Sequence, residues 1–257
     1  MNRRSFLLGS GLTTAGLISS GWGESAKAEA APITDLANST IPADENPRSC
    51  RPEDPLAALM DGNQRFVAAW RQKNQATTMA ARAEAMAGLW QHDCFLSADV
   101  LSTGQAPWAG ILSCADSRVS PEWVFDAAPS DLFVVRSAGN TAFDDAIASM
   151  EFAVSALKTP LIMVMGHSAC GAVAAARNTD PLTPLLEQLV TPIRSSLTTG
   201  EDLEAAVKGN ARYAAKQLTK RSPVLADAVK EGRLTICLLY TSPSPRDRTR
   251  SRMPSSA

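Results

Sequence analysis

Histidine is scarce in this sequence of 257 residues, which contains only His92 and His167. A metal site built from three histidines of one chain is therefore excluded. A charge excess is missing as well, because 25 lysines and arginines stand against 26 aspartates and glutamates. Composition thus gives no electrostatic argument for a nucleic-acid partner or an acidic membrane surface. This balance favours a small molecule as the partner.

The sequence also lacks the cysteine spacing of a disulfide scaffold. Its five cysteines are an odd number, scattered without framework spacing, which argues against a set of structural disulfides. Cys50 lies in a proline-rich stretch with no partner in sequence reach, so we interpret it as incidental. The 45% content of hydrophobic residues is ordinary for a soluble globular protein and allows a sizeable core.

The N-terminus resembles a twin-arginine export signal. Arg3 and Arg4 precede a weakly apolar stretch, rich in Gly, Ser and Thr, that runs to about Trp22, and residues 26–30 offer small-x-small sites for a signal peptidase. An uncleaved membrane anchor is the alternative, but the apolar run is well below the roughly 20 residues that a spanning helix needs. We therefore expect a signal peptide over residues 1–30, export to the periplasm or an equivalent extracytoplasmic space, and no stable membrane span in the mature form.

The rest of the chain divides into an arm, one domain and a tail. Residues 31–54 are proline-rich and predict an extended arm, and residues 55–236 predict a single domain that opens with a helix starting at Pro55. Residues 232–236 are expected to begin a last strand that is cut short by the change in composition after Ile236. Residues 237–257 shift abruptly to Ser, Pro and Arg, a composition that cannot bury a core. They resemble translated adapter or vector sequence joined to a truncated reading frame; a disordered basic tail is the alternative, and neither has an assigned function.

Three short apolar runs predict the central sheet. They span residues 108–112, 132–135 and 161–165, and helical patterns separate them. Alternation of strand and helix in this order indicates parallel strands joined by crossover helices. The predicted fold class is therefore α/β, with a mainly parallel central sheet flanked by helices and an N-terminal helical arm.

Two short motifs follow the first and third of these runs, at residues 113–118 and 166–171. Both motifs fall at carboxyl ends of predicted strands, the edge where open parallel sheets bind ligands. His167 and Cys170 are three residues apart and point the same way if the turn is helical. With Cys114 they form a set of two thiolates and one imidazole, which suits zinc and leaves its fourth position for water or substrate. The alternative is two buried thiols and a core histidine.

A second pair of possible metal ligands stands apart from these motifs. His92 and Cys94 are two residues apart, but nothing nearby completes a ligand set. We expect a surface or packing role for them.

The motifs taken together resemble β-class carbonic anhydrase. The similarity rests on five groups of residues: Gly62-Asn63-x-Arg65-Phe66; Gln105-x-Pro107; Cys114-x-Asp116-x-Arg118-Val119; Arg136-x-Ala138-Gly139-Asn140; and Gly166-His167-Ser168-x-Cys170-Gly171-Ala172-Val173, with Ser222-Pro223 extending the match. The resemblance implies a lyase that interconverts carbon dioxide and bicarbonate through zinc-bound hydroxide, with one Zn²⁺ per chain. It also implies a homodimer or a dimer-based oligomer.

The resemblance assigns roles to individual residues. Cys114, His167 and Cys170 would hold the zinc, as the spacing also predicts. Asp116 and Arg118 would form the family's catalytic dyad, in which the arginine pairs bidentately with the carboxylate and keeps it off the metal. A plain salt bridge within a turn is the alternative for this pair.

Other positions bear on the family subtype. Gln105 matches the glutamine that the open, plant-like subtype uses beside the substrate. Ile111 and Ser113 stand where the bicarbonate-regulated subtype tends to have tryptophan and glycine, so the open subtype is favoured. Phe152 departs from that subtype, which often has tyrosine there, and lacks its hydroxyl.

Two other functions stay open at this point. The same scaffold could hydrolyse carbonyl sulfide or carbon disulfide, because access to the pocket rather than the ligand set would decide the substrate. A non-catalytic zinc or thiol protein is the other alternative, with Cys114 and Cys170 joining when zinc is absent.

Overall fold

The computed structural model describes residues 48–90 and 96–241. All of the described residues belong to one compact unit. In chain order the described elements are α2 (Pro55–Gln75), α3 (Met79–Ala87), α4 (Ala98–Thr103), β1 (Ala109–Cys114), α5 (Pro121–Val124), β2 (Leu132–Ser137), α6 (Asp144–Ser155), β3 (Leu161–His167), α7 (Gly171–Arg177), α8 (Pro184–Arg194), α9 (Leu203–Arg221), α10 (Pro223–Lys230) and β4 (Thr235–Thr241).

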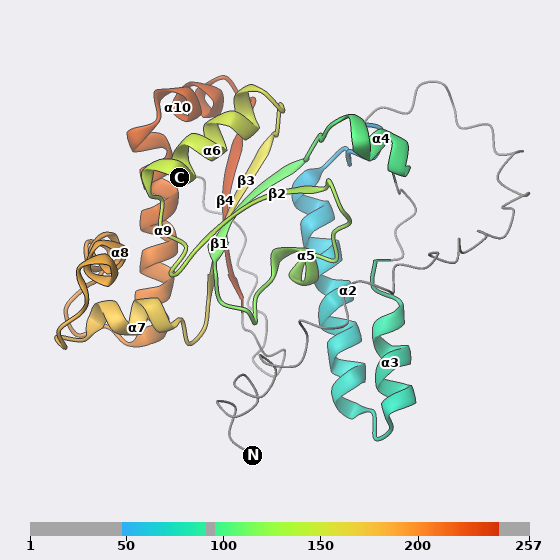
Figure 1. Ribbon diagram of the computed structural model, residues 1–257, viewed down its shortest axis with the longest axis horizontal. Helices are drawn as coiled ribbons and strands as arrows, with labels where there is room; N and C mark the ends of the chain where they lie inside the picture. The colour runs from blue at the N-terminus through green and yellow to red at the C-terminus, as the bar shows by residue number, and fades with distance from the viewer. Residues whose placement is uncertain (1–47, 91–95, 242–257) are drawn as a thin grey trace, which may run out of the picture. The chain divides into compact units, whose positions relative to one another are not determined.

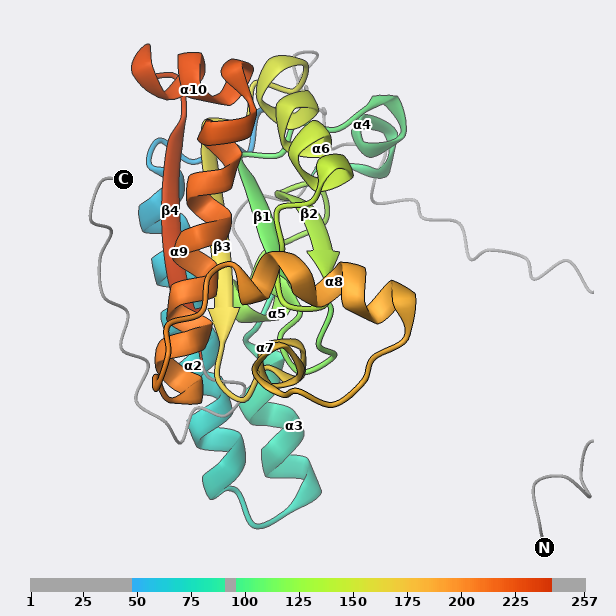
Figure 2. The same ribbon diagram turned by 90° about the vertical axis from the view of Figure 1, so that its left-hand side faces the viewer.

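The four strands form one parallel sheet (Figure 1), and Figure 2 shows them side by side in the order β2-β1-β3-β4. The chain begins the sheet in its middle with β1, adds β2 on one side, and then returns to the other side for β3 and β4. This topology confirms the predicted α/β fold with a parallel central sheet. It also puts β1 and β3 next to each other, so that the two motifs which follow these strands meet at one edge.

Helices cover both faces of the sheet, as the two views show (Figures 1 and 2). Alternate residues of a strand point to opposite faces, so Leu112 and Ile162 pack with α6, α9 and α10. Ile111 and Met163 lie in a second cluster with Leu59 of α2 and with side chains of α5. Burial on both faces explains why the strands appear in the sequence as uninterrupted apolar runs.

Helix α2 starts where the sequence predicts and is anchored along one face. Asp54 accepts a hydrogen bond from the backbone N–H of Ala57, and proline occupies the first turn. Farther along, Asn63 Nδ2 donates to Val124 O at 2.9 Å, and Arg65 Nε lies 2.6 Å from the buried Asp126 carboxylate. Part of the Gly62-Asn63-x-Arg65-Phe66 motif therefore fastens the helical arm to the segment around α5.

The final strand is longer than the sequence predicts. β4 runs to Thr241 rather than ending at Ile236, and it pairs with β3 over its whole length. Every second residue of the strand points to the interior and is buried, namely Cys237, Leu239 and Thr241. This alternation is the pattern of a strand with one buried face. The change in composition after Ile236 hides it in the sequence. The prediction for the remaining tail concerns residues 242–257, which lie outside the described residues.

The segment before α2 is tied to the amino end of the sheet. Arg51 donates hydrogen bonds to four backbone carbonyls, those of Ala106, Pro107, Leu157 and Lys158. Cys50, next to it, is disulfide-bonded, so the interpretation of Cys50 as incidental is wrong. The number and spacing of cysteines do not indicate a pairing between residues that only the fold brings together.

Several other predictions fall outside the described residues. These are the export signal within residues 1–30, most of the proline-rich arm, and the pair His92 and Cys94. None of the described helices is both long enough and apolar enough to cross a lipid bilayer.

Candidate metal centre

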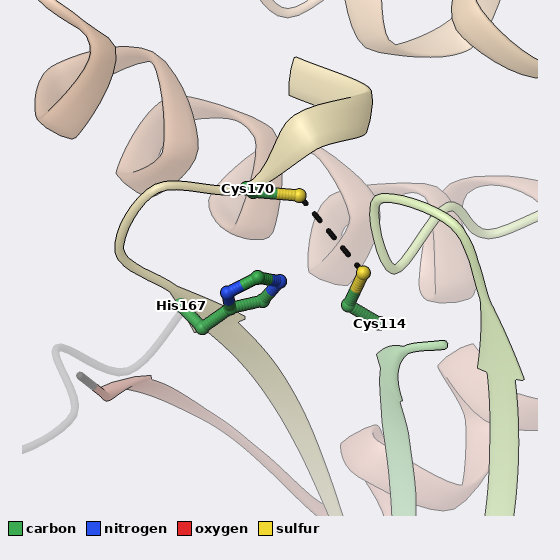
Figure 3. Close-up of side chains that lie close together, drawn as sticks. All are labelled: Cys114, His167 and Cys170. Carbon is green, nitrogen blue, oxygen red and sulfur yellow. Dashed lines mark hydrogen bonds between the residues drawn. The ribbon is translucent and has the colours of Figure 1, made fainter. Parts of the chain in front are cut away.

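Three potential metal ligands meet at the carboxyl edge of the sheet, where the sequence predicts them (Figure 3). Cys114 is the last residue of β1, His167 is the last residue of β3, and Cys170 caps the start of α7. Their ligand atoms all lie within 4.8 Å of one another, and the two sulfur atoms are 3.9 Å apart. All three side chains are buried. Two adjacent parallel strands therefore bring together residues that are more than fifty positions apart in the chain.

The imidazole of His167 is oriented for metal binding. Its Nδ1 lies 3.0 Å from the carbonyl oxygen of Ser168, and because a carbonyl can only accept, the proton belongs on Nδ1. Nε2 then carries a lone pair, yet this atom is buried and has no hydrogen-bond partner among the described residues. An isolated buried acceptor is costly. A metal ion at Nε2 would remove that cost, and a carbonyl behind the ring is the usual support of a ligating histidine.

The two cysteines differ in their tendency to ionise. Hydrogen bonds from the Cys170 thiol and from the backbone N–H groups of Gly139 and Asp116 lower the pKa of Cys114 to about 4. The neighbouring Cys114 and burial raise the pKa of Cys170 instead. The chain alone therefore favours one thiolate over two. A divalent cation between the sulfurs would allow the second thiolate to form, so the donor set fits zinc.

Asp116 and Arg118 lie directly beside these ligands. Arg118 donates from Nε to Asp116 Oδ1 at 2.9 Å and from Nη2 to Oδ2 at 2.6 Å, and its backbone N–H also bonds Oδ1. These hydrogen bonds hold the pKa of the Asp116 carboxyl well below its usual range. The carboxylate Oδ2 is 4.0 Å from His167 Nε2. An ionised, restrained carboxylate thus faces the place where a metal would bind.

Arg118 also connects the two motifs. Its Nη2 donates to the carbonyl oxygen of Ala169 at 3.2 Å, in the turn between His167 and Cys170. Ala169 has a positive φ of 53°, a backbone conformation that costs free energy for a residue with a side chain. The turn that carries two of the ligands is therefore held in shape partly by a residue of the other motif.

Gln105 is not brought to the metal centre of its own chain. It is exposed and precedes the amino end of β1, whereas Cys114 ends that strand. Because a strand advances about 3.3 Å per residue, the length of β1 separates the two side chains. The number of residues between two positions of a strand determines whether they lie at the same edge of the sheet. Gln105 is nine residues before Cys114 and therefore lies at the opposite edge.

Two residues of the Arg136-x-Ala138-Gly139-Asn140 motif contact the site without having been assigned a role. The backbone N–H of Gly139 donates to Cys114 Sγ at 3.2 Å. Gly139 has a φ of +81°, and a Cβ atom there would lie 2.5 Å from Ile193 Cδ1, so glycine is required for this close approach. Arg136 contacts the backbone of the first motif. The sequence could have indicated this role, because the motif lies at the carboxyl end of β2. Parallel pairing of β2 with β1 places that end at the same edge of the sheet as Cys114.

Comparison with known proteins gives a consistent result. A family model described as carbonic anhydrase matches residues 109–244, more than half of the chain. Carbonic anhydrase 2 of Mycobacterium tuberculosis is 42% identical over 119 residues, which are 46% of this chain and 49% of that protein. The chain thus spans about half the length of the curated relatives it matches first.

Solved structures support the fold. A β-carbonic anhydrase of Aspergillus fumigatus has a TM-score of 0.54 at 24% identity, covering 79% of this chain and 92% of its own. One of two tetrameric β-carbonic anhydrases from the ascomycete Sordaria macrospora has a TM-score of 0.51 at 25% identity, covering 56% of this chain and 79% of its own.

Proposed function

The chain belongs to the β-class carbonic anhydrase family, and we propose that it catalyses the reversible hydration of carbon dioxide to bicarbonate and a proton with one Zn²⁺ ion per chain. The observation that carries this proposal is the buried group of Cys114, His167 and Cys170, with the Asp116 carboxylate 4.0 Å from the free nitrogen of the histidine. Three protein ligands leave one position of a tetrahedral zinc site open, which is typical of catalytic rather than structural sites.

The residues of the chain divide the work between holding the ion and orienting the reaction. Cys114 and Cys170 would hold zinc as thiolates, and His167 would do so through Nε2. Zinc, when bound, would act as a Lewis acid that makes a water molecule nucleophilic near neutral pH. Asp116 would accept a hydrogen bond from that nucleophile and so direct its lone pair toward carbon dioxide.

Arg118 would keep Asp116 available for this task. A carboxylate this close to a metal site could become a fourth ligand and close the site. The bidentate hydrogen bonds from Arg118 occupy both carboxylate oxygens, and such a pair is strong and geometrically specific. This arrangement supports assignment to the open, plant-like subtype, in which the aspartate is held by the arginine.

Stopped-flow hydration of carbon dioxide on zinc-loaded protein tests the proposal. We expect catalysis that follows zinc content and that disappears when Cys114 is replaced by serine. Hydrogen sulfide release from carbonyl sulfide, measured on the same preparation, identifies the alternative substrate class. Zinc-loaded protein that hydrates no carbon dioxide would refute the proposed activity.

We propose further that the enzyme is a homodimer or a dimer-based oligomer. Strand β2 is an edge of the sheet and its side chains are mostly only half-buried. Phe133 of this strand contacts Phe152, which is 51% exposed. An open strand edge beside an exposed aromatic side chain is a surface that a second copy could cover. Gln105 could then contact substrate only at the metal centre of another copy, because β1 separates it from its own.

Export through a twin-arginine signal completes the proposed function. Two independent features support it: the pattern around Arg3 and Arg4, and the disulfide bond of Cys50. Disulfides persist in oxidising compartments such as the bacterial periplasm and are rare in the cytosol. Cell fractionation of the full chain and of an Arg3→Lys, Arg4→Lys variant tests this: the variant should stay in the cytoplasm, and equal periplasmic amounts of both would refute it.

A further inference from the structure

Arg136 contacts the backbone of the metal centre from the neighbouring strand. It is the penultimate residue of β2 and pairs in register with Ser113 of β1. Its Nε donates to the carbonyl oxygen of Cys114 at 3.0 Å, and its Nη2 donates to the carbonyl oxygen of Asp116 at 2.8 Å. One guanidinium group therefore bridges the first metal ligand and the carboxylate residue two positions later.

The hydrogen bonds of Arg136 lie at the point where the strand pairing of β1 ends. Cys114 is the last residue of β1, and the backbone N–H of Ala115 still bonds Ser137 of β2 at 2.9 Å. Beyond that point no strand pairing holds the chain, and the Asp116 carbonyl accepts hydrogen bonds from the backbone N–H of Val119 at 3.2 Å, within the turn, and from Arg136. The two N–H groups of Arg136 extend the hydrogen bonding of the sheet by one further step. A planar guanidinium offers these donors in a fixed geometry, which an ammonium group cannot reproduce.

We infer that Arg136 is a positioning residue that sets the separation between the Cys114 ligand and the Asp116 carboxylate. This inference rests on the proposed function. Arg136 differs from Arg118, because Arg118 bonds the carboxylate itself whereas Arg136, within the described part of the chain, bonds main-chain oxygens. The two arginines restrain Asp116 from both ends: Arg118 holds its side chain, and Arg136 holds its backbone relative to the metal ligand.

The expected effect of losing Arg136 is confined to the metal centre. The side chain is exposed at the sheet edge and is not part of the apolar core. Its removal leaves the strand pairing of β1 and β2 intact, so the protein should fold. The turn between Cys114 and Asp116 would become free to rearrange, which should weaken metal binding and alter the position of the carboxylate.

The test compares Arg136→Ala, Arg136→Lys and wild type, with Arg51→Lys as the matched control. Arg51 also bonds backbone carbonyls, but at the opposite end of the sheet. We expect Arg136→Ala to bind zinc about 10- to 100-fold more weakly in a chelator competition, the usual range for residues that support metal ligands. Its cobalt-substituted form should show shifted thiolate and d–d absorption bands, and kcat should fall with KM little changed. Arg136→Lys should be impaired as well, because an ammonium cannot span both carbonyls, while Arg51→Lys should match wild type.

Each outcome decides the inference. A variant Arg136→Ala with wild-type zinc affinity, cobalt spectrum and kcat overturns it. So does a loss of thermal stability with an unchanged cobalt spectrum, because the role would then be structural only. Complete rescue by Arg136→Lys would show that charge and not the bridging geometry matters, and would overturn it too. If the wild type binds zinc but hydrates no carbon dioxide, the proposed function fails, while zinc affinity and cobalt spectra still decide the role of Arg136.

Discussion

Arg118 and Asp116 are joined by two parallel hydrogen bonds, from Nε to Oδ1 and from Nη2 to Oδ2, at the rim of the metal centre. The pair does more than neutralise charge at the surface. It keeps Asp116 ionised and fixes its Oδ2 4.0 Å from His167 Nε2. The carboxylate can therefore accept a hydrogen bond at the metal centre while it stays ionised and bound to Arg118.

Replacing Asp116 by asparagine should abolish most turnover while leaving the metal in place. The amide has similar volume but cannot serve as a charged acceptor for the nucleophile. We expect kcat for carbon dioxide hydration to fall by about 100-fold or more, the range found when one preorganised polar group at a reacting centre is removed. Zinc content per chain, measured on the same sample, should stay at the wild-type value. Full activity in Asp116→Asn would exclude the orienting role.

The Asp116 carboxylate should also make stability depend on pH in the acid range. Its pKa is depressed in the folded chain and about 3.9 in an unfolded one, so the stabilisation is complete above about pH 4 and is lost as pH falls toward the folded value. In metal-free protein, wild type should have a larger free energy of unfolding than Asp116→Asn near neutral pH. This difference between the two proteins should decrease below about pH 4. Urea denaturation at several pH values measures this. The difference should shrink in an Arg118→Ala background, because the Arg118 side chain is the largest cause of the shift while the backbone N–H of residue 118 still bonds Oδ1.

Zinc binding should depend on Cys114 and Cys170 but not on every buried cysteine. Replacing either residue by serine removes a thiolate and should lower the zinc content of purified protein well below one ion per chain. Cys237 is the matched control, because it is equally buried and free but lies on β4 outside the ligand group. Cys237→Ala should retain zinc. Metal analysis after dialysis distinguishes the variants, and equal losses in all three would argue against the assigned ligands.

Gly62 should not tolerate a side chain, although it lies within a helix. A Cβ atom there would lie 1.8 Å from the carbonyl oxygen of Phe125. The gain in helix propensity is about 1 kcal/mol, whereas overpacking costs about 1–3 kcal/mol, and a rigid backbone oxygen puts this site at the upper end. We expect Gly62→Ala to lower the free energy of unfolding by about 2 kcal/mol as the net of these two terms. In Gly209→Ala the nearest atom outside the helix is at 3.4 Å, so that variant should be neutral or slightly stabilised.

The oligomeric state should respond to the exposed aromatic surface beside β2. Phe152→Glu places a charge where a second copy would bury an aromatic ring, so the particle mass in light scattering should drop toward that of one chain. Val224→Glu is the control, because Val224 is also exposed but belongs to α10, which packs with α9 beside the β4 edge. A Phe152→Glu protein with unchanged mass would place the contact between copies elsewhere.

Local patterns in the chain were sufficient to predict the parallel sheet and the ligand group. Apolar runs bounded by turn residues define strands, and the βαβ order forces those strands to be parallel, so Cys114 and His167 had to end at the same edge. Asp116 and Arg118 are two residues apart in a turn, a separation at which side chains can pair without any help from the rest of the fold. These predictions depend only on residues that are close together in the sequence and on the order of the strands and helices.

The fold alone decided the contacts between residues that are remote in sequence. Cys50 is disulfide-bonded, Arg136 reaches the Cys114 carbonyl from another strand, and Gln105 lies at the wrong edge for its own chain. A motif records which residue types occur, but the direction of a guanidinium or the distance along a strand depends on register and packing. Composition likewise concealed the end of β4, which continues because its alternate side chains find space against β3 and its neighbours. The order of the residues was therefore enough to predict the ligand set and the kind of chemistry. The hydrogen bonds that fix the positions of these groups form only when separate strands and turns pack together, because they depend on neighbours in three dimensions.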